Sequence, residues 1–361
     1  MRFEGRKYDA GVSPWADWRP SFSSTVPREL VHRRAISEVF MTDVRRIGEG
    51  RYLVAAQWPR LHPFFCSRPG AYDTALIAES LRQATILVAH VMEGVPMGQI
   101  FLMPDMSVHA LGGHSSDPGT PTEVNMLLEV EVSQRNARGP VVLRVEARFD
   151  VGGHPIATGA AGARLVDPAS YARLRPRSTA DGQQPQTVPL PPERVGHRFS
   201  HNVAIGAGGS ADTWPLYVDD TNPTFFDHPL DHVPGLLMVE GIRQALRVRM
   251  TAPHLDFQAF QASFLKIVEL DDQASVSLRT VVIEGQKEGR ATAAITVDEA
   301  VCVELSCRFT LNAANGPRQG LTHEPRGGQG PGTQPAWSRG PSPARGLTTC
   351  PRSAPAHQHD A

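Results

Sequence analysis

Two stretches of the sequence, ESLRQA at residues 79–84 and EGIRQA at residues 240–245, repeat the motif Glu-x-x-Arg-Gln-Ala. Shorter matches precede both stretches in the same order. The first half carries Trp58-Pro59 and then HPFF at residues 62–65, and the second half carries Trp214-Pro215 and then NPTFF at residues 222–226. Because several matches occur in one order, we predict that the chain is internally duplicated and that its two halves share one fold.

Each repeated motif lies inside a predicted helix. In the first half, Asp73 is suited to cap the helix, and Gly94 followed by Pro96 supplies the stop. The apolar residues between them cover most of the helix circumference, which is typical of a helix buried on all sides. The helix of the second half, LLMVEGIRQALRVRM at residues 236–250, ends before Pro253.

Runs typical of β-strands surround both helices. In the first half they are ISEVFMTDV (36–44), RYLVAAQW (51–58), QIFLMPDMSVHAL (99–111), EVNMLLEVEVSQ (123–134), PVVLRVEARFDV (140–151) and IATGAAGARLV (156–166). In the second half they are TWPLYV (213–218), FQAFQASFLKIVEL (257–270), ASVSLRTVVIEG (274–285), ATAAITVD (291–298) and AVCVELSCRFTL (300–311). One helix among many antiparallel strands predicts an α+β fold in which a sheet wraps around its helix.

Composition divides the chain into four parts. We expect a first domain at residues 28–167 and a second at residues 194–312. Residues 168–193, rich in Pro, Gln and Arg, are expected to be a linker. Residues 313–361 have almost no aliphatic side chains and are expected to be a disordered tail.

Charge and cysteine usage narrow the classes of protein. The chain has 36 basic and 37 acidic residues, so no overall basic charge favours binding to nucleic acid or to an anionic membrane. Its four cysteines lack zinc-type spacing, and no apolar stretch is long enough to be a signal core or a membrane span. We therefore expect a cytoplasmic protein without a bound metal or cofactor.

The repeated motif places charges on otherwise buried helices. Glu79 and Glu240 each share a helix face with an arginine three residues on and a glutamine four residues on. These partners are Arg82 and Gln83 in the first half, and Arg243 and Gln244 in the second. The pairs are interpreted either as buried salt bridges or as a base beside an anion clamp, and the residues alone favour neither.

The loop before the second helix, DHPLDHVPG at residues 227–235, gathers two histidines and two aspartates. Histidine titrates near neutral pH, so His228 and His232 are candidate acid–base groups. The alternative is that they only pack and cap the loop. A metal site is less favoured, because no third set of ligands is apparent.

The segments AQWPRLHPFF, LIAESLRQA and FDHPLDHVPGLLMVEGIRQA resemble the A-factor biosynthesis (AfsA) family of actinomycete bacteria over about Leu30 to Leu311. The resemblance implies a tandem hot-dog fold, in which each half is an antiparallel sheet wrapped around one long helix, and the halves pair within one chain. It implies an acyltransferase that joins a β-ketoacyl group from acyl carrier protein to dihydroxyacetone phosphate. An aldol-type cyclisation would follow, in the synthesis of a γ-butyrolactone or furan signal that controls secondary metabolism.

The second-half segment also looks like the hot-dog dehydratases of fatty-acid synthesis, in which a histidine before the helix and a carboxylate on it do the acid–base work. We therefore expect Glu240 to be the main base, assisted by His228 or His232, with Glu79 as its partner in a second site or as a structural echo. Arg243 and, less strongly, Arg82 are expected to hold the substrate phosphate. Gln244 and Gln83 complete the expected substrate-binding set.

Two other functions remain open at this stage. A dehydratase or thioesterase acting on acyl thioesters would need no phosphate-binding arginine on the helix. A non-enzymatic acyl-binding regulator would need no base beside its pocket. Four aromatic residues, Phe64, Phe65, Phe225 and Phe226, are expected either to line an acyl tunnel or to belong to an ordinary core.

Overall fold

The computed structural model describes residues 15, 17–65, 72–112, 119–137, 139–175, 187–210 and 212–311. All of them belong to one compact unit that spans Met1–Ala314. The expected tail at residues 313–361 lies outside the described residues.

The first half is built on the helix α1 (Thr74–Val91). It begins as predicted, because the side chain of Asp73 accepts a hydrogen bond from the backbone N–H of Ala75 at 2.9 Å. Every residue of α1 is buried except Arg82 and Val91, which confirms a helix enclosed on nearly all sides. No described helix is both long enough and apolar enough to span a membrane.

The strands of the first half follow the predicted runs closely. They are β1 (Met41–Gly48), β2 (Arg51–Trp58), β3 (Ile100–Leu102), β4 (Asp105–Ala110), β5 (Thr122–Asn136), β6 (Gly139–Val151) and β7 (His154–Val166). The prediction is wrong at Ile36–Glu38, which form a short 3-10 helix instead of the start of a strand. The side chain of Glu38 is buried by this turn.

The second half repeats the plan with a shorter helix, α3 (Gly235–Arg249), which starts directly after Pro234 and lies within one residue of the predicted bounds 236–250. Its strands are β8 (Thr213–Pro215), β9 (Asp256–Phe264), β10 (Ala274–Glu284), β11 (Glu288–Val297) and β12 (Ala300–Thr310). Unlike α1, α3 buries two arginines, Arg243 and Arg247.

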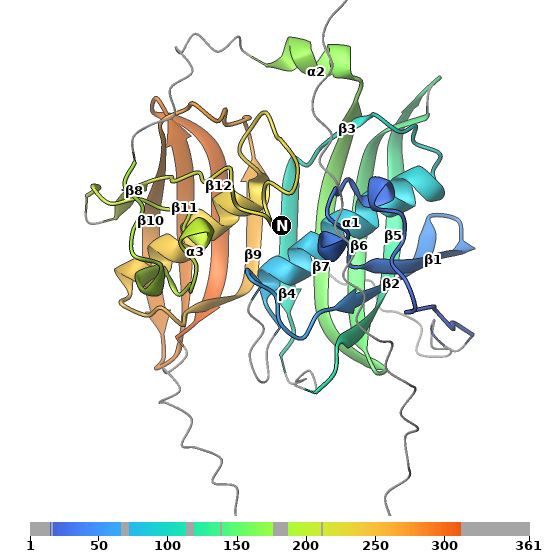
Figure 1. Cartoon of the computed structure of the whole chain (residues 1–361), viewed down its shortest axis with the longest axis horizontal. Helices are drawn as coiled ribbons and strands as arrows, with labels where there is room; N and C mark the ends of the chain where they lie inside the picture. The colour runs from blue at the N-terminus through green and yellow to red at the C-terminus, as the bar shows by residue number, and fades with distance from the viewer. Residues whose placement is uncertain are drawn as a thin grey trace, which may run out of the picture. The chain divides into compact units, whose positions relative to one another are not determined.

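The described strands of both halves join into one antiparallel sheet of 12 strands, in the order β1-β2-β5-β6-β7-β4-β9-β12-β11-β10-β8, with β3 paired to β7. The halves meet where β4 pairs with β9, with Val108 opposite Phe260. Both long helices lie on the same face of the sheet, side by side (Figure 1). This arrangement confirms the predicted tandem hot-dog fold, with the two halves paired within one chain.

The stretch between the halves is not entirely irregular. Residues 168–193, which we predicted as a linker, contain the helix α2 (Pro168–Leu174). Asp167 caps this helix by accepting a hydrogen bond from the backbone N–H of Ser170 at 2.9 Å. Tyr171 is the residue of α2 that is buried, so the helix is anchored by one aromatic side chain.

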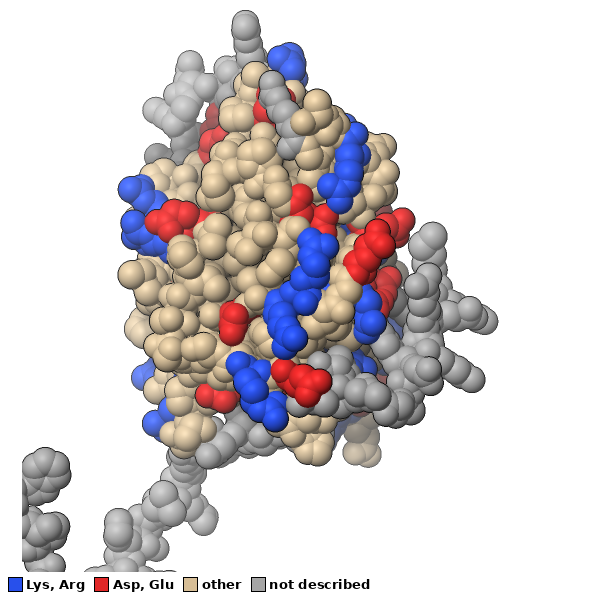
Figure 2. Space-filling view, turned by 90° about the vertical axis from the view of Figure 1, so that its right-hand side faces the viewer, with Lys and Arg blue, Asp and Glu red and all other residues tan. Residues whose placement is uncertain are grey.

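Surface charges of both signs are interspersed. On the face shown in Figure 2, lysine and arginine side chains lie next to aspartate and glutamate side chains. Exposed ion pairs include Arg249–Asp212 at 2.6 Å and Arg144–Asp105 at 2.5 Å. Exposed pairs of this type contribute little to stability, so the core and the buried charges matter more.

Candidate functional site

A buried ionic cluster surrounds the glutamate of α3. Its members, here called the Glu240 network, are Asp73, His197, Glu240, Arg243, Gln244 and Arg247. Glu240 Oε1 lies 2.8 Å from His197 Nε2, within hydrogen-bond distance, and Glu240 Oε2 accepts a hydrogen bond from Arg243 Nε at 2.7 Å. Arg243 also reaches into the other half, where its Nη1 donates to Asp73 Oδ1 at 2.7 Å. The Glu240 network thus ties the start of α1 to the middle of α3.

The Glu240 network is closed to solvent. The side chains of Glu240, Arg243 and His197 are only 1%, 3% and 3% exposed. Burial alone would raise the pKa of Glu240, but the charge of Arg243 and the hydrogen bond from His197 hold it below the ordinary value. Of the two interpretations of this pair, a buried salt bridge or a base beside an anion clamp, the lowered pKa and the ion pair with Arg243 support the salt bridge.

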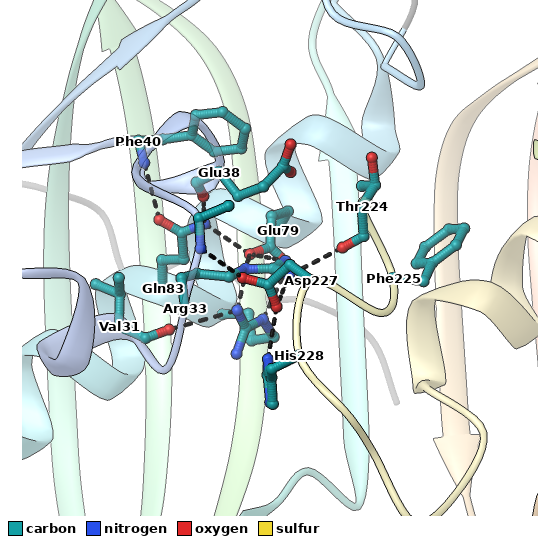
Figure 3. A network of polar contacts seen from close by, with 12 residues as sticks. Val31, Arg33, Glu38, Phe40, Glu79, Gln83, Thr224, Phe225, Asp227 and His228 are labelled. Carbon is teal, nitrogen blue, oxygen red and sulfur yellow. Dashed lines mark hydrogen bonds and ion pairs between the residues drawn. The ribbon is translucent and has the colours of Figure 1, made fainter. Parts of the chain in front are cut away.

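A matching cluster surrounds the glutamate of α1. Its members, here called the Glu79 network, are Arg33, Glu79, Arg82, Gln83, Asp227 and His228 (Figure 3). Glu79 pairs with Arg33 Nη2 at 2.6 Å and with Arg82 Nη2 at 2.9 Å. Burial would raise the pKa of Glu79, but the guanidinium groups of Arg33 and Arg82 lower it to about 2. Glu79 therefore stays ionised at neutral pH.

The two glutamines of the repeated motif hold the glutamates in place. Gln83 Nε2 donates to Glu79 Oε1 at 2.7 Å and to the carbonyl of Glu38 at 2.8 Å, and its Oε1 accepts from the N–H of Phe40. Gln244 makes the same set of contacts in its own half. Both amides are fully buried, so these contacts leave neither of them exposed to a substrate, contrary to our expectation.

Sequence reasoning missed Arg33 and His197, which contact the two glutamates. In each half, the glutamine donates a hydrogen bond to a backbone carbonyl, that of Glu38 in the first half and that of Asn202 in the second. Arg33 lies five residues before Glu38, and His197 lies five residues before Asn202. The two are therefore structural equivalents of different chemistry. Their one sequence signal is this common spacing, which becomes visible only after the glutamine contacts are known.

The Glu79 network is the more open of the two. The side chains of Arg82 and His228 are 21% and 30% exposed, whereas that of Arg243 is 3% exposed. A small anionic substrate could therefore contact Arg82 without disrupting the fold. Arg243 is instead held on both sides by carboxylates, Glu240 and Asp73.

His228 lies with the Glu79 network although it precedes α3. Its Nδ1 is 2.6 Å from Asp227 Oδ1, and Arg33 Nη1 is 3.2 Å from the same oxygen (Figure 3). The backbone N–H groups of Arg34 and Ala35 bind the second oxygen of Asp227. The loop thus crosses to the first half. We expected His228 to assist Glu240, but it lies in the Glu79 network instead.

His232 is placed elsewhere. Its Nδ1 is 2.7 Å from Asp231 Oδ1 and 3.1 Å from the hydroxyl of Tyr171 on α2. Arg175, directly after α2, pairs with Asp231 and with Glu269. These contacts attach the loop to the connecting helix, and none of them involves Glu79 or Glu240.

The described side chains form neither a cluster of metal ligands nor an aromatic tunnel. Within the described ranges, no group of three or more His, Cys, Asp or Glu residues could hold a metal ion. Phe64, Phe65 and Phe225 are buried in the core, with Phe226 packed against it. Phe64 contacts Phe225 at 4.7 Å between ring centres and stacks on His197 at 5.3 Å. These contacts support the core-packing interpretation.

A double hot-dog fold with one buried glutamate on each central helix defines the class of this protein. The chain belongs to the A-factor biosynthesis hotdog domain family, which matches residues 16–167 and 178–312. It is 38% identical over 252 residues to the 2-oxo-3-(phosphooxy)propyl 3-oxoalkanoate synthase of Streptomyces virginiae, covering 69% of this chain and 85% of that protein. It is 36% identical to the enzyme of the same name from Streptomyces coelicolor, covering 73% and 88%.

Solved structures with a similar fold are more distant. A putative oleoyl thioesterase from Lactobacillus plantarum is 15% identical, with a TM-score of 0.43, and covers 74% of this chain and 98% of that one. The 12:0-ACP thioesterase from Umbellularia californica is 11% identical, with a TM-score of 0.45, and covers 71% and 93%.

Proposed function

We propose that this chain is a 2-oxo-3-(phosphooxy)propyl 3-oxoalkanoate synthase. It transfers a β-ketoacyl group from a thioester of acyl carrier protein to the hydroxyl of dihydroxyacetone phosphate, the first step towards a γ-butyrolactone-type signal. The observation that carries this proposal is the 38% identity to a synthase of that name over 85% of its length. The family match to both halves supports it.

The reaction is assigned to the open edge of the Glu79 network. Phosphate needs a cationic partner that it can reach, and the side chain of Arg82 is 21% exposed there. A guanidinium offers two parallel N–H groups to two phosphate oxygens, and Glu79 fixes the orientation of this fork. Arg82 is therefore the proposed phosphate ligand.

His228 is the proposed acid–base group at this edge. In the tautomer that donates its Nδ1–H to Asp227, its Nε2 is left for a substrate. Asp227 is itself fixed by Arg33 and has a fully buried side chain. A buried carboxylate beside an imidazole orients the ring, and a proton donor to a leaving thiol must be held in such a fixed position.

We propose that the Glu240 network has a structural role and stabilises the contact between the two halves. We had expected Glu240 to be the main base and Arg243 to bind the phosphate. A carboxylate whose pKa is lowered is a weak base at neutral pH, and an arginine shared by two buried carboxylates is not available to a phosphate. A structural role accounts better for both residues.

The direct test is to incubate the full chain with a β-ketoacyl thioester of acyl carrier protein and dihydroxyacetone phosphate. Mass spectrometry should detect the phosphorylated ester, or a butenolide formed from it by loss of water. Free acid alone would indicate a thioesterase, and an unsaturated acyl thioester formed from a β-hydroxyacyl substrate would indicate a dehydratase. Repeating the reaction with a thioester of a small thiol tests whether the carrier protein is needed.

A further inference from the structure

A second pair of titratable side chains, Glu38 and His62, lies next to the Glu79 network and is not a member of it. Glu38 Oε1 is 3.3 Å from His62 Nε2, and both side chains are more than nine-tenths buried. His62 Nδ1 accepts the backbone N–H groups of Phe64 and Phe65, each at 3.1 Å. A ring nitrogen that accepts two N–H groups carries no proton, so the proton lies on Nε2 and is donated to Glu38.

The other oxygen of this carboxylate is left without a partner. Glu38 Oε2 is fully buried and has no hydrogen-bond partner among the described residues. Buried polar atoms are nearly always hydrogen-bonded, because an unmade bond costs about 1–3 kcal/mol. Glu38 Oε2 is therefore a buried acceptor that can take a hydrogen bond from another molecule.

The second half builds the same position from two neutral side chains. Asn202 is the equivalent of Glu38, and Asn222 is the equivalent of His62, since Asn222 Oδ1 accepts the N–H groups of Thr224 and Phe225 at 2.9 Å. The two asparagines bind each other at 3.2 Å, and Asn202 Nδ2 also donates to the carbonyl of Pro63. A neutral pair thus serves the fold at this position of the second half, where the first half has Glu38 and His62.

A second unpartnered atom comes from the opposite half. The hydroxyl of Thr224 is buried and lacks a hydrogen-bond partner within the described part of the chain. Its own carbonyl accepts a hydrogen bond from Arg33 Nη1 at 2.9 Å. Burial lowers the pKa of Arg33, but the carboxylates of Glu79, Asp227 and, to a smaller extent, Glu38 raise it above the ordinary value. Glu38 and Thr224 thus both lie near this guanidinium, at one edge of the network (Figure 3).

We propose that Glu38 and Thr224 form the acceptor subsite of the enzyme, which binds the α-hydroxyketone end of the triose phosphate. This inference rests on the proposed acyl transfer. A carboxylate accepts the hydrogen bond of the substrate hydroxyl, and a threonine hydroxyl donates one to the neighbouring ketone. Arg82 holds the phosphate at the other end of the same small molecule.

Glu38 then acts as the base of the transfer. The hydroxyl oxygen attacks the thioester carbonyl, its proton moves to Glu38 Oε2, and an ester C–O bond forms as the C–S bond breaks. The departing thiolate takes a proton from the His228 imidazolium. Glu38 returns its proton to solvent and His228 regains one, so the cycle moves one proton from the alcohol to the thiol with no oxidant or other reactant.

The decisive variant copies the second half into the first. Glu38→Asn combined with His62→Asn reproduces the Asn202–Asn222 pair, which satisfies its own hydrogen bonds. In the full chain, with dihydroxyacetone phosphate and a β-ketoacyl thioester, we expect this double variant to keep its thermal midpoint and lose at least about a hundredfold in kcat. Glu38→Gln should show the same loss, because it keeps the size of the side chain but cannot take a proton.

Thr224→Val tests the ketone contact separately. We expect KM for dihydroxyacetone phosphate to rise about tenfold, the value of one lost hydrogen bond, while KM for the thioester stays the same. The preference over sn-glycerol 3-phosphate, which has a hydroxyl in place of the ketone, should shrink by a similar factor. A merely structural threonine would not change this preference.

The outcomes separate the two levels of the proposal. If the wild-type chain forms no phosphorylated ester, the proposed function fails. If the wild type forms it and a folded double variant, Glu38→Asn with His62→Asn, is equally fast, the acceptor subsite is refuted and Glu38 is only structural. An unfolded double variant leaves Glu38→Gln to decide, and normal turnover in that variant refutes the base.

Discussion

Arg33 and His197 occupy equivalent positions in the two halves, and each contacts the glutamate of its own central helix. Arg33 Nη2 lies 2.6 Å from Glu79 Oε1, and His197 Nε2 lies 2.8 Å from Glu240 Oε1. Arg33 continues to Asp227 in the opposite half and so connects Glu79 to His228. His197 instead stacks against Phe64. Duplication of one fold has therefore produced two networks with different chemistry.

The two histidines of the loop before α3 should differ in their effect on catalysis. His228→Gln should lower kcat by about a hundredfold or more, the usual range for a lost acid–base group. His232→Gln is the matched control, because it changes the same residue type in the same loop but contacts Tyr171 and Asp231. Steady-state rates with the natural substrates measure the difference. A larger loss in His232→Gln would place the reaction near α2.

Arg82→Lys should raise KM for dihydroxyacetone phosphate about tenfold or more, since an ammonium cannot form the two parallel bonds of a guanidinium. The fold should survive, because Arg33 remains paired with Glu79. Initial rates over a range of phosphate substrate concentrations give this value, with the thermal midpoint as control. An unchanged KM would remove Arg82 from the binding site.

Arg243→Lys should act on stability instead. The guanidinium of Arg243 bridges Glu240 and Asp73 in a fully buried position, and a lysine cannot serve both. We expect a loss of about 2 kcal/mol or more in the free energy of unfolding, measured by denaturant titration. Arg82→Lys is the exposed counterpart and should cost less. Wild-type stability with a raised KM would return Arg243 to the phosphate role that its motif suggested.

The acid side of the stability profile should report on Glu79. Its pKa is lowered to about 2 from an ordinary value of 4.5, so its ion pairs stabilise the fold fully above about pH 4.5. That contribution disappears as the pH falls towards 2, because the carboxylate must then be protonated. Glu79→Gln should be less stable than the wild type at about pH 7, and the difference should shrink between about pH 4.5 and 2. A constant difference across this range would contradict the assigned pKa.

A chain that ends at Gly316 should keep both its thermal midpoint and its activity. The last of the described strands, β12, ends at Thr310, and the family match ends at residue 312. The composition beyond it offers almost no aliphatic side chains to bury. Thermal unfolding and product formation, compared with those of the full chain, test the prediction. A clear loss of either would give the tail a role.

Much of the architecture can be predicted from short stretches of the sequence. The helices α1 and α3 and most strands follow from apolar periodicity and from end signals such as Asp73 and Pro234, which act within a few residues. Ile36–Glu38 is one exception, because tertiary contacts can override the strand preference of so short a run. The run predicted to extend to Leu270 is another, since β9 ends at Phe264. The duplication predicted that both halves share this plan.

The candidate site divides in the same way. The pairing of Glu79 with Arg82, and of Glu240 with Arg243, is determined by the sequence alone, because residues three apart on a helix share a face. Only the tertiary structure brings Arg33 to Glu79 and carries His228 across to the opposite half. The His228 contact depends on how the halves join along β4 and β9, and no local pattern encodes the distance between residues so far apart in the chain. The state of each glutamate was decided there too, since burial and the number of surrounding arginines act on the pKa in opposite directions.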